Sequence, residues 1–208
     1  MNDHEMQLFF VDAVDSPGIE YRMERLVPWV LHSDRQYYRV LFAHHDTPKK
    51  LAERIACPDS EVSLLNMRLL IADDEIAGGY IGFSGRQLLR RREADVVDLY
   101  RDTEPHQRAE LRRRLKDLLH LLAPVGPNDF YVSKMQLYPG MNGPALSQPL
   151  MEECIQRARR SGFERIRIDV DCDGEIIADL CREHGFEIIR RGEAPIAGIQ
   201  YLNMALTL

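Results

Sequence analysis

The chain has 208 residues, a formal net charge of −6 and 45% hydrophobic residues, which suits one large globular domain or two small ones. The acidic balance, with a pI near 5.7, argues against a protein that binds nucleic acid mainly by neutralising phosphates. No apolar run approaches the ~20 residues that cross a bilayer, and the start MNDHEMQ does not resemble a signal peptide. We therefore expect neither a nucleic-acid partner nor a membrane.

The cysteines have neither C-x-x-C spacing nor the density of a secreted disulfide scaffold. They stand at Cys57, Cys154, Cys172 and Cys181. We expect reduced thiols and a cytoplasmic protein.

The N-terminal third predicts one strand and two helices. Residues 6–14, MQLFFVDAV, are typical of a strand. Apolar residues recur at helical spacing from Ile19 to Leu31, in a helix that Pro28 should kink or divide. Thr47 followed by Pro48 predicts the start of the second helix, with a capping hydroxyl and a ring at the first helical position.

His44, His45 and Asp46 come just before that second helix and resemble a metal or acid–base cluster. Adjacent side chains in such a loop are more often surface residues or a helix cap, and no third ligand is spaced to join them. We predict no metal site.

The middle of the chain predicts a hairpin and then a helical segment. Residues 66–85 contain two strands around an ADDE turn, and residues 86–122 show a leucine stripe opposite Arg112, Arg113 and Lys116. The chain is locally basic from Arg86 to Lys116, and this surface is either a solvated outer face, or a wall of a binding site or a partner surface that prefers acidic ligands.

The second half predicts alternating strands and helices. Strands are expected at 130–138, 163–170, 186–190 and 198–208, and helices at 149–161 and 174–184. The first two of these strands should be parallel neighbours joined by a right-handed crossover. We expect one domain over residues 1–208.

Two segments resemble a known family. FYVSKMQLYPGMNGPALSQPLMEECIQRARRSGFERIRIDV and the later LCREHGFEI are similar to the core of the acetyl-CoA-dependent N-acetyltransferases of the GNAT superfamily. The resemblance covers residues 130–190, is weaker over 66–84 and is positional before that. It implies a mixed α/β (α+β) fold, with a central sheet flanked by helices and a helical insertion, here 86–122, between the third and fourth strands.

The resemblance also implies a site for acetyl-CoA as co-substrate. The family holds the pyrophosphate in the loop before the main helix and contacts the thioester carbonyl through a backbone N–H of the fourth strand. The matching positions in this chain are Met135, Gln136, Leu137, Asn142, Gly143, Pro144, Ala145, Leu146 and Ser147.

This loop departs from the family pattern. Asn142 stands where the family has Arg or Gln, Ala145 and Ser147 stand where it prefers glycine, and Pro144 has no N–H to donate. We expect the helix to start after Ser147, because Pro149 then lies in the first turn at little cost. The site then has a phosphate-binding position with few donors.

The catalytic groups are less visible. Cys181 stands where the family commonly has a Tyr that protonates the leaving thiolate, so it is either that acid or a packing residue. The strand at 130–138 contains no carboxylate; Asp169 and Asp171 on the next strand are more typical of solvated strand ends. Tyr201 on the last strand is an equally weak candidate.

The resulting hypothesis is an N-acetyltransferase that acts on an amine of a small molecule or protein, as a monomer or homodimer. The alternative is a non-catalytic binding or interaction protein on the same scaffold, with weakened or lost CoA binding.

Overall fold

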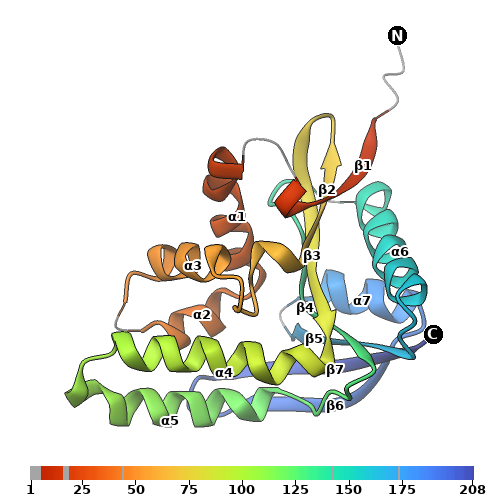
Figure 1. Ribbon diagram of the computed structural model, residues 1–208. Coiled ribbons are helices and arrows are strands. Elements are labelled where there is room, and N and C mark those ends of the chain that lie inside the picture. The colour runs from red at the N-terminus through yellow and green to blue at the C-terminus, as the bar shows by residue number, and fades with distance from the viewer. Residues whose placement is uncertain (1–5, 16–18, 44, 142, 173) are drawn as a thin grey trace.

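The computed structural model describes residues 6–15, 19–43, 45–141, 143–172 and 174–208. They form a seven-stranded sheet in the order β1-β2-β3-β4-β5-β7-β6 (Figure 1). Among the described strands, β4 and β5 pair in parallel and the other neighbours are antiparallel. The strands are β1 (Leu8–Asp12), β2 (Met67–Ala72), β3 (Glu75–Ser84), β4 (Asp129–Leu137), β5 (Arg165–Asp171), β6 (Glu187–Ala194) and β7 (Ile199–Thr207). The mixed sheet and its parallel central pair confirm the prediction.

Helices cover both faces of the sheet (Figure 1). One face packs against α6 (Pro144–Arg160) and α7 (Glu175–Glu183). The other face is covered by the remaining helices: α1 (Ile19–Ser33), α2 (Arg35–Leu41), α3 (Thr47–Ala56), α4 (Gly85–Asp102) and α5 (Arg108–Leu118). Alternation along β5 puts Ile166, Ile168 and Val170 in the core beneath α6, and therefore directs Asp169 to the opposite face.

The helices α4 and α5 connect β3 to β4, which confirms the helical insertion. Leu111 and Leu118 of its leucine stripe are buried, whereas Leu119 is 62% exposed. Arg112 and Arg113 are exposed, on the outer side of α5. The insertion therefore packs through its apolar stripe and turns these two arginines to solvent.

The N-terminal helices differ in detail from the sequence prediction. α1 runs without interruption from Ile19 to Ser33 with Pro28 inside it, so the proline does not divide the helix. At α3 the cap is Asp46 rather than Thr47, because the Asp46 carboxylate accepts a hydrogen bond from the backbone N–H of Lys49.

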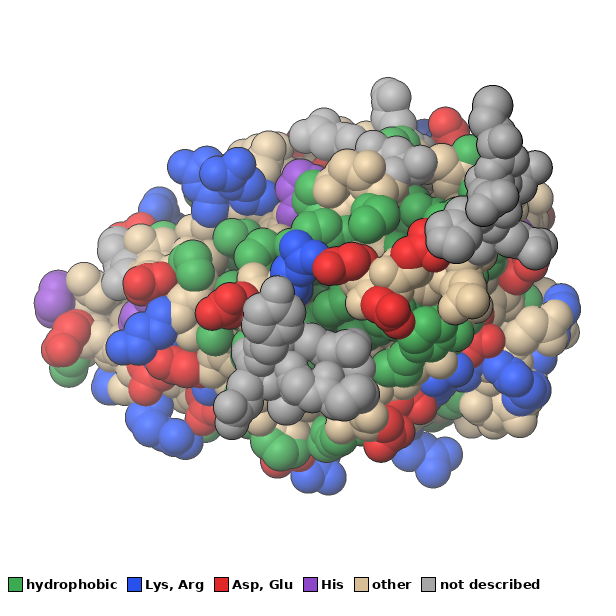
Figure 2. Space-filling view, turned by 90° about the horizontal axis from the view of Figure 1, so that it is seen from above, with side chains coloured by type: hydrophobic (Ala, Val, Ile, Leu, Met, Phe, Trp, Pro, Cys, Tyr) green, Lys and Arg blue, Asp and Glu red, His purple; other side chains and the backbone are tan. Residues whose placement is uncertain are grey.

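In the described ranges, no helix is both long and apolar enough to cross a membrane. On the face shown in Figure 2, basic and acidic side chains are interspersed, and apolar side chains are visible between them. This face therefore presents mixed charges rather than a broad surface of one sign.

Candidate active site

The parallel strands β4 and β5 pair over a short stretch. Four residue pairs join them, from Asp129 with Arg165 to Val132 with Ile168, although β4 continues to Leu137 and β5 to Asp171. The pairing of β4 with β3 shifts register at the same place, because Ile81 pairs with Lys134 whereas Gly82 pairs with Val132. An irregularity of this kind increases local strand twist, which turns the end of β4 away from β5.

Beyond this point, on the side away from β3, none of the described strands pairs with β4. The N–H of Tyr138 donates to the carbonyl of Ala77 at 2.7 Å, which fixes the alternation of the ladder with β3. Because that alternation has a period of two, the backbone groups of Met135 and Leu137 point away from β3. The Gln136 carbonyl accepts a hydrogen bond of 3.0 Å from Trp29 Nε1. Of the three predicted β4 residues, Met135 and Leu137 therefore present backbone donors on the open side.

The start of α6 corrects the sequence prediction. The helix begins at Pro144, not after Ser147, and Pro149 lies inside it in the second turn. Proline suits the first helical position, because its fixed φ is helical and its missing N–H would have no intrahelical partner there. Pro149, in contrast, leaves the Ala145 carbonyl without its i+4 donor.

The first turn of α6 offers few donors to a phosphate. Leu146 N–H and Ser147 N–H both donate to the Gly143 carbonyl, at 3.1 Å each, and Pro144 has no N–H. Ala145 is then the residue of the first turn whose N–H is not directed at that carbonyl. Gly143 has a φ of +133°, which favours glycine, and nothing lies within 4 Å of where its side chain would begin. Asn142 lies outside the described residues.

A cavity of about 210 Å³ lies on the other face of the sheet, enclosed by α2, α3, α4 and α5. Its floor contains side chains from three strands: Tyr131, Ser133 and Lys134 of β4, Asp169 of β5 and Tyr201 of β7. Ser133 and Asp169 directly follow Val132 and Ile168, the last paired residues. The floor therefore reaches the point where β4 and β5 separate.

A hydrogen-bonded chain of polar groups crosses this floor. Tyr131 OH donates to Asp169 Oδ2 at 2.9 Å, and Asn203 Nδ2 donates to Asp169 Oδ1 at 2.7 Å. Arg92 Nη2 donates to Tyr131 Oη at 2.8 Å, and Arg92 Nε donates to Glu61 Oε2 at 3.0 Å. Burial raises the pKa of Asp169, and these donors oppose the rise by stabilising its ionised form.

A second set of buried polar side chains lies beside these hydrogen-bonded residues. Lys134 Nζ donates to Asp34 Oδ2 at 2.6 Å, and the Tyr201 hydroxyl donates to the same oxygen. Lys134 Nζ also lies 5.3 and 5.4 Å from the ring centroids of Tyr37 and Tyr38. Burial raises the pKa of Tyr201 well above its usual value, so its hydroxyl stays protonated. This group joins α2 to β4 and β7.

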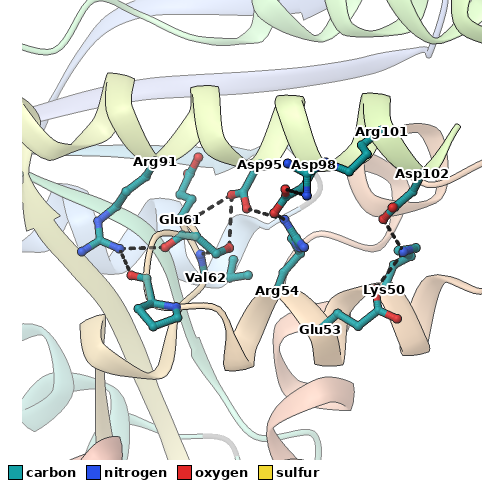
Figure 3. Close-up of polar contacts among 12 residues, drawn as sticks. Lys50, Glu53, Arg54, Glu61, Val62, Arg91, Asp95, Asp98, Arg101 and Asp102 are labelled. Carbon is teal, nitrogen blue, oxygen red and sulfur yellow. Dashed lines mark hydrogen bonds and ion pairs between the residues drawn. The ribbon is translucent and has the colours of Figure 1, made fainter.

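Ion pairs hold the inserted helix α4 to α3 along the cavity wall (Figure 3). Lys50 Nζ contacts Asp102 Oδ2 at 2.7 Å, and Arg54 Nη1 contacts Asp98 Oδ2 at 2.6 Å. Asp95 accepts hydrogen bonds from Ser60 Oγ and the Glu61 N–H, and burial raises its pKa from 3.8 to about 6. The insertion therefore forms a wall of the cavity, through its acidic and apolar faces.

The arginines singled out by the sequence lie elsewhere. Arg112 and Arg113 do not line this cavity. Of the cluster before α3, Asp46 caps the helix, His45 Nε2 lies 3.4 Å from Thr103 Oγ1, and His44 lies outside the described residues.

Cys181 lies in the apolar core beneath α6. It is fully buried on α7, and burial raises the pKa of its thiol to about 12. A thiol with so high a pKa is a weaker acid than a free cysteine, which favours the packing interpretation. The role of Cys181 as a proton donor stays a prediction.

Sequence reasoning did not single out Arg92, Tyr131 or Ser133, and it interpreted Asp169 as a solvated strand end. A tyrosine and a serine in an apolar strand are a weak signal of a polar site, and their partners on α4 and β5 are distant in sequence.

Neither a scan of protein-family models nor a search of curated proteins found a match. Solved structures do match over nearly the whole chain. An N-acetyltransferase from Staphylococcus aureus Mu50 superposes with a TM-score of 0.69 at 12% identity, covering 95% of this chain and 100% of the other. An acetyltransferase of the GNAT family from Streptococcus pneumoniae gives a TM-score of 0.52 at 15% identity, with coverages of 98% and 99%. The chain has the GNAT acetyltransferase fold.

A further neighbour is a Drosophila melanogaster polyamine N-acetyltransferase, described as forming N-acetylagmatine, with a TM-score of 0.55 at 14% identity and coverages of 98% and 100%. The superpositions establish the GNAT fold, whereas identities this low leave substrate and catalysis to be argued from the site.

Proposed function

We propose that the protein transfers an acetyl group from acetyl-CoA to an amine. The observation that carries the proposal is the end of β4–β5 pairing at Val132 and Ile168. It leaves a strand edge with free backbone groups between the start of α6 and the cavity. A thioester held along that edge lies next to the cavity on the face opposite α6. An amine bound in that cavity can then attack the thioester directly.

In this proposal the pantetheine arm lies along β4 and extends its hydrogen bonding through Met135 and Leu137. The pyrophosphate lies at the start of α6, near Gly143 and Ala145, where the helix dipole favours negative charge. Because Pro144 brings no donor and the Leu146 and Ser147 N–H groups point at the Gly143 carbonyl, we expect weaker binding than a glycine-rich loop gives.

A second function has its own supporting observations. The reduced donor set at α6 and the raised pKa of Cys181 favour a binding protein of the same fold, which holds CoA weakly or not at all and performs no chemistry. The two functions differ in one measurable product, the free CoA thiol that acetyl transfer releases.

The test is calorimetric titration with acetyl-CoA, followed by a screen of primary amines for released CoA thiol. We expect measurable binding and thiol release with at least one amine. Binding without release by any amine would favour the binding protein, and absence of binding would contradict the placement of the cofactor.

A variant pair tests the position of the pyrophosphate. Gly143→Val should weaken acetyl-CoA binding about tenfold or more, since a branched side chain at φ +133° strains the backbone by roughly 1–3 kcal/mol and obstructs the phosphate. Gly198→Val is the matched control, because Gly198 also has a positive φ and open space around it but lies in the turn between β6 and β7. Equal affinities of the two variants would contradict this position.

A further inference from the structure

Most charged side chains that line the cavity have a partner of opposite charge. Lys50 pairs with Asp102, Arg54 with Asp98, Arg92 with Glu61 and Lys134 with Asp34, at 2.6 to 3.0 Å, and Asp95 lies 3.6 Å from Arg54. Asp169 differs. Within the described part of the chain, no ion pair includes it, and its hydrogen-bond donors are the neutral Tyr131 hydroxyl and Asn203 amide. The cavity floor therefore holds a carboxylate that lacks a cation in contact.

Ser133 is a further buried polar group on the cavity floor, on the strand beside Asp169. Ser133 is 3% exposed and lines the same cavity, and among the described residues its Oγ has no hydrogen-bond partner. Ser133 and Asp169 occupy adjacent positions on neighbouring strands, one residue beyond the last pair, Val132 with Ile168. A buried hydroxyl without a hydrogen-bond partner destabilises the fold, and a bound ligand that hydrogen-bonds to it removes that cost.

The rest of the cavity wall is largely apolar. Aromatic and branched side chains from five helices or loops surround the floor, among them Phe42, Leu51, Val62, Leu99 and Leu115. Because the other charges that line the wall are already paired, a second charge on a ligand would have to displace an existing ion pair.

We propose that this cavity binds the acceptor as a single primary ammonium group on an apolar body, with the ammonium hydrogen-bonded to Asp169 and Ser133 and the body against the apolar wall. This inference rests on the proposed acetyl transfer and names its substrate class. Asp169 is the group that both anchors the ammonium and takes its proton.

Acetyl transfer in this cavity moves two protons and one acyl group. The ammonium gives one proton to the Asp169 carboxylate, and the nitrogen lone pair forms a bond to the thioester carbon. The carbon–sulfur bond breaks with its electron pair on sulfur, and the second nitrogen proton passes to that sulfur. The products are the amide, the CoA thiol and one proton, which Asp169 releases to solvent.

The charged and polar groups that face Asp169 set the pH at which it works. Arg92 from α4, Tyr131 from β4, Asn203 from β7 and Arg167 on its own strand favour the ionised carboxylate, and burial opposes them more strongly, so its pKa is raised. The base must be ionised to accept a proton. The acid limb of kcat/KM should therefore report Asp169 and lie above the ordinary pKa of an aspartate.

The experiment compares 2-phenylethylamine with 1,4-diaminobutane as acceptors, using the wild type, Asp169→Asn and Asp171→Asn. Asp171 is the matched control, because it lies on the same strand but does not line the cavity. For the wild type, we expect kcat/KM to be at least about tenfold higher with 2-phenylethylamine than with 1,4-diaminobutane. A tenfold ratio corresponds to roughly 1.4 kcal/mol. Asp169→Asn should lower kcat/KM by roughly 10²–10⁴ and abolish its acid limb, while the dissociation constant of acetyl-CoA is unchanged. Asp171→Asn should behave as the wild type.

Amine binding gives a readout that does not need turnover. In calorimetry with CoA present, 2-phenylethylamine should bind the wild type and bind Asp169→Asn about tenfold more weakly. Ser133→Ala, a change that keeps the strand intact, should raise the KM of the amine without moving the acid limb. It remains informative if Asp169→Asn is poorly folded.

The failures are distinguishable. A preference for the diamine, an unchanged acid limb in Asp169→Asn, or no amine binding to the wild type would overturn this inference. If acetyl-CoA itself does not bind, the proposed function fails as well.

Discussion

Single residues show where burial changes the chemistry expected from the sequence. Cys181 stands at the family's acid position, yet the structure encloses it in the core beneath α6. For Asp169 the change is in the other direction, from an unimportant residue to a candidate site residue. The sequence suggested a solvated carboxylate, whereas the structure puts it on the cavity floor with two neutral hydrogen-bond donors. Burial depends on packing between distant segments, so neither outcome is encoded in the residues around these positions.

Cys181→Ala separates the two interpretations of that residue. A proton donor requires kcat to fall by roughly 10²–10⁴ with the dissociation constant of acetyl-CoA kept. Because the thiol is fully buried and its pKa is raised to about 12, we expect kcat to change little. The free energy of unfolding should instead fall by about 1 kcal/mol, because alanine leaves the space of the sulfur atom unfilled in the core. The measurements are kcat against pH and urea denaturation, for the wild type and Cys181→Ala. A large fall in kcat at unchanged stability would restore the proton-donor role.

Single elements were largely predictable, since their signals are local. Alternation and helical periodicity predicted the hairpin, the insertion and the order of elements from β4 to β7, each confirmed within a few residues. The start of α6 was wrong. The sequence prediction placed Pro149 in the first turn, whereas the structure starts the helix at Pro144 and keeps Pro149 in the second turn. The packing of Leu146, Leu150 and Met151 against the sheet provides a reason, because their burial stabilises a longer helix despite the lost hydrogen bond.

The cost of Pro149 can be measured directly. Pro149→Ala restores an N–H that can donate to the Ala145 carbonyl, a gain of up to about 3 kcal/mol in a helix interior. The more flexible unfolded chain offsets up to about 1 kcal/mol of that gain. We expect a net increase of about 1–2 kcal/mol in the free energy of unfolding, measured by urea denaturation. Pro144→Ala is the control and should not stabilise, because proline suits the first helical position. Equal effects of the two substitutions would contradict the observed start of α6.

Across the molecule as a whole, the site exists because segments far apart in the chain meet at one point of the sheet. The cavity draws its walls from α2, α3, α4 and α5 and its floor from β4, β5 and β7. The sequence resemblance indicated the proposed cofactor side, on β4 and α6 within residues 129–160. The proposed acceptor side combines α2 and α3, the insertion helices α4 and α5, and side chains of three strands, so no single local pattern predicted it. Of the interpretations of the basic surface, the solvated outer face fits Arg112 and Arg113, whereas Arg92, Asp95 and Leu99 of the same insertion line the cavity.

The proposed function depends above all on acetyl-CoA binding along the open edge of β4 and at the start of α6. Amide hydrogen exchange, followed residue by residue by NMR with and without acetyl-CoA, tests this binding mode directly. In the free protein the N–H groups of Met135 and Leu137 point away from β3 and should exchange faster than their paired neighbours. Acetyl-CoA should slow exchange at Met135, Leu137 and Ala145, and leave the β6–β7 turn near Gly198 unchanged. Protection that is absent from these three amides, under conditions where calorimetry shows binding, would contradict this binding mode.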